Sequence, residues 1–410
     1  MPDRSINGDD MKRFVLLPLA AVAAATLALT GCSASGGGSS GGGTAAGGDT
    51  INLGVVLSQT GPFSSIGLPE VQGAKAATEQ INASGGVQGK KINLIVEDAK
   101  STPQGAAAAA TKLIQNDKVV GLVGPEATAL ALAVAPIAHE RKVPMVSGSA
   151  SFLQALPAQY LDYSFASAAS TAKGFAPLAA YWKGTGLTKV AIIGPKGDVF
   201  DGVVAAIKNI PSLTLTGTEQ FQPGQADITA NVAKIAATGP QAIIVAGATA
   251  DAATAQRAWK ALNVDAQIVQ IGSQANEAFI KLAGPESFTE RSLFIGFPTT
   301  VSSTLPADHP SKKAATEYVE LMKRADPNFD PGSIAVLAWN GVMAYRDAIT
   351  AAGSTDAAAL RDALERTEMT NPLGVWTRTP TDHDGSTNPY IVATHDASGW
   401  KYLGGGQGSP

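Results

Sequence analysis

Short apolar runs rich in β-branched residues alternate along the chain with longer segments whose apolar residues recur at helical spacing. Runs of the first kind, which suit strands, occur at residues 51–57, 92–97, 119–123 and 143–146. The helical segments between them occur at residues 68–83, 102–116 and 129–141. Alternation of this kind is typical of βα units and predicts a parallel sheet covered by helices.

The same alternation begins again after residue 168. Further strands are predicted at residues 190–193, 213–221, 242–245, 268–271 and 293–297, and helical patterns follow at 312–324, 334–352 and 356–365. The run at residues 389–395 is predicted as the final strand. A chain of 410 residues, 45% of them hydrophobic, is long enough to bury two cores, so we expect an α/β protein with two lobes.

Local signals mark two helix ends. Thr102 followed by Pro103 predicts a helix start, because the threonine hydroxyl can accept a backbone N–H of the first turn and proline is tolerated there. The sequence Ser84-Gly85-Gly86 predicts the end of the preceding helix.

Charge and composition exclude one class of partner. The formal net charge is only −4, and the chain has no long run or stripe of Lys and Arg, so no nucleic-acid partner is expected. A small neutral or zwitterionic molecule fits this charge balance better.

The first 32 residues carry export signals. Lys12 and Arg13 form a positive segment, and the apolar residues 14–28 follow it. This order is typical of a secretory signal peptide, and the apolar run is shorter than the roughly 20 residues of a membrane-spanning helix. We expect residues 1–31 to contain a signal peptide. Residues 1–10 are polar and acidic and do not suit its positive segment, so we expect translation to start at Met11.

The sequence Leu29-Thr30-Gly31-Cys32 resembles the lipobox of bacterial lipoproteins, which implies that the Cys32 thiol carries diacylglycerol. Cys32 is the one cysteine in the sequence, so no disulfide can form within the chain. Residues 33–48 are almost entirely Gly, Ser, Ala and Thr, a composition typical of flexible linkers. The sequence predicts an exported bacterial protein whose linker, residues 32–49, is held at the outer face of the cell membrane by the lipid on Cys32.

Five motifs occur in order in the first half of the chain: INLGVVLS at 51–58, GPF at 61–63, INASGGVQG at 81–89, VGPEAT at 123–128 and VSGSAS at 146–151. Together they resemble the leucine/isoleucine/valine-binding family of ABC-transporter solute-binding lipoproteins. The resemblance implies the type I periplasmic binding protein fold, in which two doubly wound parallel-sheet lobes are joined by three crossovers and have a ligand cleft between them. Lobe 1 would comprise residues 50–168 and 298–376, lobe 2 residues 169–297 and 377–403, and residues 404–410 a tail.

The resemblance also implies a function. Proteins of this family capture a small polar ligand by hinge closure of the lobes and deliver it to the permease and ATPase subunits of an ABC importer. We expect this protein to do so as a monomer, without a cofactor. A ligand sensor of the same fold, which presents its closed form to a regulatory or receptor partner, is the alternative, and the neighbouring genes would distinguish the two.

Ligand contacts in lobe 1 are expected at the carboxyl ends of the strands, where open α/β sheets bind ligands. Matching the family's contacts by position implies that the Thr128 hydroxyl and the loop of Ser149, Ala150 and Ser151 hold the ligand, with Ile66 near its side chain. An alternative role for Thr128 is to cap the helix that follows.

Lobe 2 departs from the amino-acid binders of the family. Position matching places Phe200 or Val199, Ala248 or Thr249, and residues 272–274, including Gln274, at the pocket. Amino-acid binders carry aromatic residues at the first two places and a carboxylate at the third. We therefore hypothesise that the ligand is a carboxylate or amide compound, and that branched-chain amino acids bind weakly unless Glu126 turns inward to take their ammonium group.

Enzyme motifs are missing from the sequence, so no catalytic residue is assigned and a hydrolase is the disfavoured alternative. Its four histidines share no metal-ligand spacing, and no metal site is expected. The SxxK pattern at residues 170–173 is better explained by Ser170 capping the start of a helix. The sequence Asp382-His383-Asp384-Gly385 is better explained by a turn.

The Cys32→Ala variant is expected to lose all lipid labelling, because a thioether at Cys32 is the only covalent attachment that the sequence offers. Metabolic labelling with a radioactive or clickable fatty acid measures this, and Ser33→Ala, which changes the next residue, should label normally. Labelling that persists in Cys32→Ala would show that the anchor is assigned wrongly.

Overall fold

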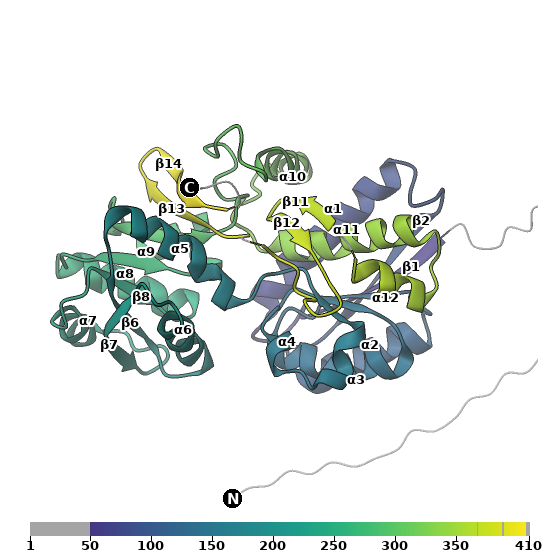
Figure 1. The fold of residues 1–410 in the computed structure, drawn as a ribbon, viewed down its shortest axis with the longest axis horizontal. Coiled ribbons are helices and arrows are strands. Elements are labelled where there is room, and N and C mark those ends of the chain that lie inside the picture. Colours follow the sequence, from purple (N-terminus) through teal and green to yellow (C-terminus); the bar gives the residue numbers. More distant parts are fainter. Residues whose placement is uncertain (1–49, 367, 388, 407–410) are drawn as a thin grey trace, which may run out of the picture. The chain divides into compact units, whose positions relative to one another are not determined.

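The computed structural model describes residues 50–366, 368–387 and 389–406. The signal peptide, Cys32 and the linker predicted above lie outside the described residues. Within them, one parallel and one mostly parallel sheet with helices on both faces form two lobes, which confirms the predicted α/β class (Figure 1). The first lobe is built on a five-stranded sheet and the second on a seven-stranded sheet.

The first sheet has the strand order β2-β1-β3-β4-β5, with every neighbouring pair parallel. Its strands are β1 (Thr50–Leu57), β2 (Lys91–Asp98), β3 (Leu122–Val123), β4 (Met145–Ser147) and β5 (Ser164–Ala166). The helices between them are α1 (Ser64–Ala83), α2 (Pro103–Gln115), α3 (Thr128–Arg141) and α4 (Phe152–Ala155). The chain then passes to the second lobe between β5 and α5.

The second sheet has the order β14-β13-β10-β9-β8-β6-β7, in which β13 and β14 are antiparallel to their neighbours. Its strands are β6 (Lys189–Pro195), β7 (Thr214–Phe221), β8 (Ala242–Val245), β9 (Gln267–Gln270), β10 (Ser292–Gly296), β13 (Ile391–Asp396) and β14 (Gly399–Gly405). Its helices are α5 (Thr171–Thr185), α6 (Asp198–Lys208), α7 (Thr229–Ala236), α8 (Thr249–Ala261) and α9 (Glu277–Ala283).

Between β10 and β13 the chain returns to the first lobe. There it forms α10 (Lys312–Ala325), α11 (Ala335–Ala352), α12 (Ala357–Leu364) and the hairpin β11 (Glu368–Asn371)–β12 (Gly374–Thr377). Tyr318, Trp339 and Trp376 of this return segment pack in one core cluster with strand β1. The first lobe is therefore assembled from two separate stretches of the chain.

Most predicted strands and helices exist, but the prediction of a single last strand is wrong. Strand β14 follows β13 after a tight turn in which the Asp396 carboxylate accepts the backbone N–H of Ser398 at 2.8 Å and Gly399 has a φ of +97°. The positive φ at glycine lets the chain reverse within three residues. Thr102 caps α2 as predicted, since its hydroxyl accepts the Gly105 N–H at 3.0 Å, and α1 ends just before Ser84.

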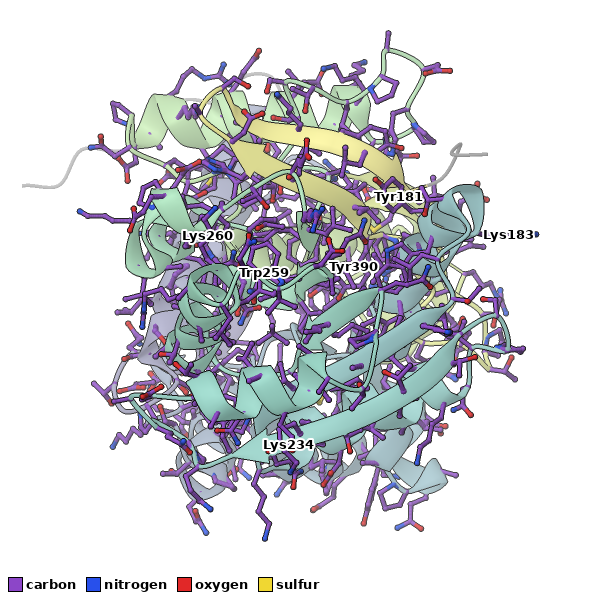
Figure 2. The ribbon with its side chains drawn as sticks, turned by 90° about the vertical axis from the view of Figure 1, so that its left-hand side faces the viewer. Tyr181, Lys183, Lys234, Trp259, Lys260 and Tyr390 are labelled. Carbon is purple, nitrogen blue, oxygen red and sulfur yellow. The ribbon has the colours of Figure 1, made fainter. Side chains whose placement is uncertain are left out.

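Alternating side chains of the strands fill the cores on both faces of each sheet. Leu53 and Val55 of β1 pack against α1 and α11, whereas Val56 packs against α2 and α3. In the second lobe, Trp259 on α8 is buried, and its indole N–H donates to the Ala266 carbonyl at 2.9 Å (Figure 2). Among the described residues, none of the helices combines the length and apolar character required to traverse a bilayer.

Helix α11 joins the return segment to the first sheet in two places. Its Tyr345 hydroxyl accepts the Leu122 N–H at 3.1 Å and donates to the Pro144 carbonyl at 2.6 Å, just before strand β4. Its first turn meets α1 at Gly73, where an added β-carbon would lie 1.9 Å from the Ala335 carbonyl oxygen. The two helices approach this closely because Gly73 has no side chain.

The Gly73→Ala variant is expected to lower the free energy of unfolding by about 1–3 kcal/mol, because the added methyl group would overlap the Ala335 backbone. Gly184→Ala is the matched control: Gly184 is exposed near the end of α5 with open space around it, so alanine there should be neutral or stabilising. Denaturant unfolding of both variants measures the difference. Equal stabilities would mean that α1 and α11 pack less tightly than described.

Candidate ligand-binding site

The loops that follow β3 and β4 are tied together by hydroxyl groups. The Thr128 and Ser149 hydroxyls share a hydrogen bond of 2.9 Å, and the Ser147 hydroxyl donates to the Pro125 carbonyl at 2.6 Å. The Ser149 N–H in turn donates to the Ser147 hydroxyl at 3.0 Å. The structure therefore brings the predicted contacts Thr128 and Ser149 together at the carboxyl edge of the first sheet.

The alternative capping role of Thr128 is wrong. Helix α3 begins at Thr128 itself, the residue in the cap position is Ala127, and no side chain caps this helix. The Thr128 hydroxyl instead bonds to Ser149 on the neighbouring loop. Ser151 occupies the position before α4 and makes no capping bond either.

Two glutamates are buried at these loops, namely Glu70 on α1 and Glu126 in the loop after β3. Glu126 accepts the Ser58 N–H at 3.3 Å with one oxygen, whereas both carboxyl oxygens of Glu70 lack a partner among the described residues. Burial, and secondarily the charge of Glu126, raises the pKa of Glu70 well above its ordinary range. Burial also raises the pKa of Glu126, against the hydrogen bonds from Ser58 that lower it. The Glu126 side chain is thus fixed within its loop, where its carboxylate accepts the backbone N–H of Ser58.

Asp98 stabilises the loop after β1, as a structural residue would. Its carboxylate accepts the backbone N–H groups of Gln59 at 2.8 Å and Thr60 at 3.3 Å, and the Thr60 hydroxyl at 2.6 Å. Burial raises the pKa of Asp98, but the hydrogen bonds from Thr60, Lys100 and Gln59 outweigh it, and the pKa is lowered.

A cavity of about 760 Å³ is lined by residues of both lobes. This volume is within the range of small-molecule sites. From the first lobe it is lined by Pro62, Phe63, Ser65, Ile66 and Pro69. From the second lobe it is lined chiefly by residues 247–249 after β8 and residues 271–274 after β9. The cavity therefore lies where the carboxyl edges of the two sheets meet.

Three of the predicted contacts, Ile66, Thr249 and Gln274, line this cavity. The Gln274 side chain is fixed because its amide N–H donates to the Gly247 carbonyl at 3.1 Å, and its Oε1 is buried without a partner among the described residues. Thr128, Ser149, Ser151, Glu126 and Phe200 are outside the lining of this cavity, and Ala150 borders a smaller hollow beside residues 380–384. The role of all these residues in binding stays a prediction.

The side chains of Phe200 and Val199 point in different directions from helix α6. Phe200 is 4% exposed and packs in the core between α5, α6 and the sheet, whereas Val199 is 60% exposed and lines the cavity. A shift of one residue along a helix turns a side chain by about 100°, so position matching cannot separate the two. In the structure it is Val199 that faces the cavity.

Asp330 also lines the cavity, and the sequence analysis did not find it. It lies in the segment before α11, where its carboxylate accepts the Gly332 N–H at 2.9 Å and the Glu277 N–H at 2.8 Å. Burial, with a smaller effect from the charge of Glu277, raises the pKa of Asp330. The Asp-Pro-Gly sequence at 330–332 predicts only a turn. The sequence therefore could not predict that Asp330 lies close to the second lobe.

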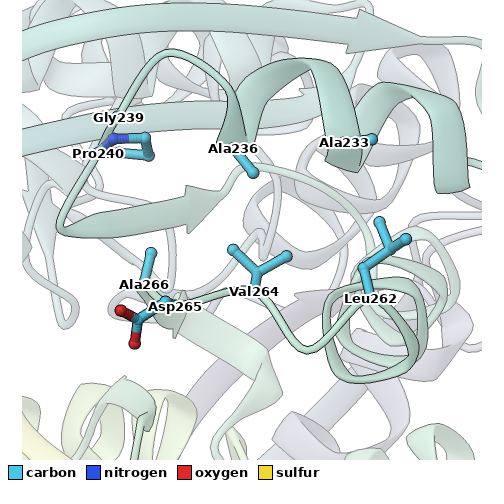
Figure 3. Close-up of a pocket in the computed structure, with 8 residues that line it drawn as sticks. All are labelled: Ala233, Ala236, Gly239, Pro240, Leu262, Val264, Asp265 and Ala266. Carbon is cyan, nitrogen blue, oxygen red and sulfur yellow. The ribbon is translucent and has the colours of Figure 1, made fainter.

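A second hollow, of about 430 Å³, lies in the second lobe between α7 and the end of α8 (Figure 3). It is bordered by Pro240 and Ala266, which precede β8 and β9. It is therefore at the amino ends of the parallel strands, opposite the edge where α/β sheets bind ligands. For this reason we regard the cavity between the lobes as the candidate site.

The two motifs set aside in the sequence analysis lie together. The Asp384 carboxylate accepts the Ser170 N–H at 3.2 Å and pairs with Lys173 at 3.2 Å, and the Gly385 N–H donates to Asp382 at 3.0 Å. The Asp382-to-Gly385 segment is a turn, as predicted. Helix α5 starts after Ser170, but the Ser170 side chain does not cap it. In the described part of the chain, no His, Cys, Asp and Glu residues group in a way that could hold a metal ion.

Comparison with known proteins identifies relatives of the whole folded part. A family model described as periplasmic binding protein matches residues 50–399. The Leu/Ile/Val-binding protein homolog 3 of Brucella melitensis is 26% identical over 319 residues, which are 77% of this chain and 83% of that protein. The leucine-, isoleucine-, valine-, threonine-, and alanine-binding protein of Pseudomonas aeruginosa is 24% identical over 332 residues, 80% of this chain and 85% of that protein.

Solved structures are similar over most of the chain. An extracellular ligand-binding receptor from Rhodopseudomonas palustris HaA2 has a TM-score of 0.72 and 26% identity, covering 86% of this chain and 99% of that one. The branched-chain amino acid transporter substrate binding protein LivJ from Streptococcus pneumoniae, in complex with isoleucine, has a TM-score of 0.70 and 21% identity, covering 87% and 99%. These similarities confirm the fold and the resemblance indicated by the opening motifs.

Thr128→Ala and Ser151→Ala are expected to weaken ligand binding by roughly 1.5–3 kcal/mol each, the usual cost of losing a hydrogen bond to a charged group. Their effect on the melting temperature of the free protein should be small, because neither hydroxyl caps a helix and the bond from Thr128 to Ser149 contributes only about 0.5–1.5 kcal/mol. Calorimetric affinity and free-protein melting measure both effects.

Thr111→Ala is the control, since the Thr111 hydroxyl bonds only to its own helix, donating to the Ala107 carbonyl at 2.8 Å. Unchanged affinity in both site variants would show that these hydroxyls do not contact the ligand.

Proposed function

Because the chain belongs to the periplasmic binding protein family, we propose that it is an extracytoplasmic solute-binding lipoprotein of an ABC importer. It captures a small polar ligand, such as a branched-chain amino acid, an amide or a carboxylate, between its two lobes. It then presents the closed form to the permease and ATPase subunits. The family consists of solute-binding proteins, and the chain is not an enzyme.

The observation that carries this proposal is the cavity of about 760 Å³ at the facing carboxyl edges of both sheets. Loops from two separately cored lobes border it, so a ligand bound there would touch both lobes at once. Contacts made only when the lobes are closed favour the closed form, and this is how a ligand drives a hinge motion.

Three connections between the lobes allow this motion. The chain crosses between β5 and α5, after β10, and between β12 and β13. We take lobe 1 as residues 50–168 and 298–376 and lobe 2 as residues 169–297 and 377–403. Rotation about a few backbone bonds in these connections can open and close the cleft.

The membrane attachment belongs to the same proposal. Lipid on Cys32 would hold the protein at the outer face of the cell membrane. Residues 33–48 would act as a flexible linker that lets the folded part move some distance from the membrane surface. A tethered binding protein meets its permease at a high effective concentration, because the linker confines it to the membrane surface.

A thermal-shift panel of branched-chain amino acids, their keto acids, short amides and aromatic carboxylates tests the proposal. A ligand of the proposed class present at a hundred times its Kd should add about 2.7 kcal/mol of stability and raise the melting temperature. Nucleotides and sugars are the comparison set and should leave it unchanged. Stabilisation by a compound of the comparison set alone would contradict the ligand class, and stabilisation by none of the compounds would contradict capture of such ligands.

A further inference from the structure

Charged groups are scarce in the wall of the cavity between the lobes. Of the residues that line it, only Asp330 and Tyr390 can ionise, and no Lys, Arg or His is among them. Burial raises the pKa of Tyr390 far above neutrality, and its hydroxyl donates to the Ala169 carbonyl at 3.2 Å. The Asp330 carboxylate is therefore the one group of this lining that can be charged at neutral pH.

The Asp330 carboxylate is held rigidly at the wall. One oxygen accepts the Gly332 N–H at 2.9 Å and the other accepts the Glu277 N–H at 2.8 Å, at the start of α9. The segment also packs closely on the second lobe, since a β-carbon on Gly332 would lie 2.1 Å from the Ala275 carbonyl oxygen. A carboxylate has about four acceptor positions, so both oxygens can still accept from a ligand.

Its position makes the Asp330 carboxylate a site for a cation. Burial raises the pKa of this carboxyl against the backbone N–H groups that lower it, and no positive side chain of the lining compensates its charge. A cation placed beside it would supply that compensation in a setting where water screens little. A ligand anion at the same place would meet repulsion, with no basic side chain of the wall to pair with.

We propose that Asp330 selects the ligand by binding a protonated amine. The rest of the wall there is mainly apolar, with Ile66, Phe175, Ile271 and Ile295 among its members. The ligand class that fits is a small apolar molecule carrying an ammonium group, of which branched-chain amino acids are examples. This inference rests on the proposed function and narrows its ligand to an amine.

Asp330 supplies a carboxylate at the cavity, which position matching in lobe 2 did not find. The hypothesis of a carboxylate or amide ligand assumed that no acid reaches the ligand near residues 272–274. Asp330, in the segment before α11, lines the same cavity as residues 272–274 and accepts the Glu277 N–H three residues further on. The two ideas make opposite predictions for ligands that differ only in the amine.

Titration calorimetry on the full protein tests the proposal with leucine, its keto acid 4-methyl-2-oxopentanoate, and 3-methylbutylamine. The wild type should bind leucine at least about tenfold more tightly than the keto acid. Asp330→Asn should weaken the amine-containing probes by about ten- to hundredfold and leave the keto acid within about twofold, because a hydrogen bond to a charged group is lost only for the amines.

Asp326→Asn is the matched control. The Asp326 carboxylate accepts the Asn328 N–H at 2.9 Å in the same kind of turn, and it is exposed outside the cavity lining. This variant should bind all three probes as the wild type does. The melting temperatures of both free variants show whether Asn at 330 also preserves the turn, since its side-chain oxygen can still accept an N–H.

The outcomes separate this inference from the proposed function. Asp330→Asn with wild-type affinity for the amines, or equal losses for leucine and the keto acid, would overturn the role of Asp330 and leave solute binding intact. Tight binding of the keto acid alone would do the same. If none of the probes and none of the wider panel bound to the wild type, both the inference and the proposed function would fall.

Discussion

Parallel alignment of the strands is the constraint on which the rest of the structure depends. In a parallel sheet every carboxyl end lies on one edge, and both lobes use the same order around their first strand: β2-β1-β3-β4-β5 and β7-β6-β8-β9-β10. The connections leave in opposite directions on either side of β1 and of β6, which opens a crevice at each point. Pro62, Phe63 and residues 247–249, which follow these switch points, line the cavity between the lobes.

The polar chemistry at the two edges is divided unequally. Lobe 1 offers hydroxyl groups that bond to one another, such as Thr128 with Ser149, and buries Glu70 and Glu126 beneath its loops. The cavity wall carries one carboxylate, Asp330, among uncharged side chains that are mainly apolar. Because the wall has so few charges, each one strongly affects which ligands can bind. An ionic group of the ligand that finds no partner in the wall loses its hydration without compensation.

The sequence predicts the elements whose signals are local, and it misses contacts made between distant segments. Residues 242–245 form β8 as expected, and Thr102 caps α2, because periodicity and capping act within a few residues. The turn at Asp396 to Gly399 is just as local, but the sequence pattern predicts one strand there where the structure has two. Asp330 is different: its neighbour Glu277 is 53 residues away, and only the docking of one lobe on the other brings the two together. Val199 rather than Phe200 faces the cavity because of a helix rotation that motif matching does not resolve.

The hydroxyl of Tyr345 has a consequence for how the protein is made. It bonds to Leu122 in β3 and to Pro144 just before β4, which a ribosome finishes some two hundred residues earlier. On the face that α11 covers, the first sheet therefore emerges with α1 but without α11, and stays so while residues 169–297 of the second lobe are synthesised. Contacts of such long sequence separation form slowly, and a nascent first lobe would expose apolar strands for the whole interval. Chaperone binding during synthesis and export would be directed to this face.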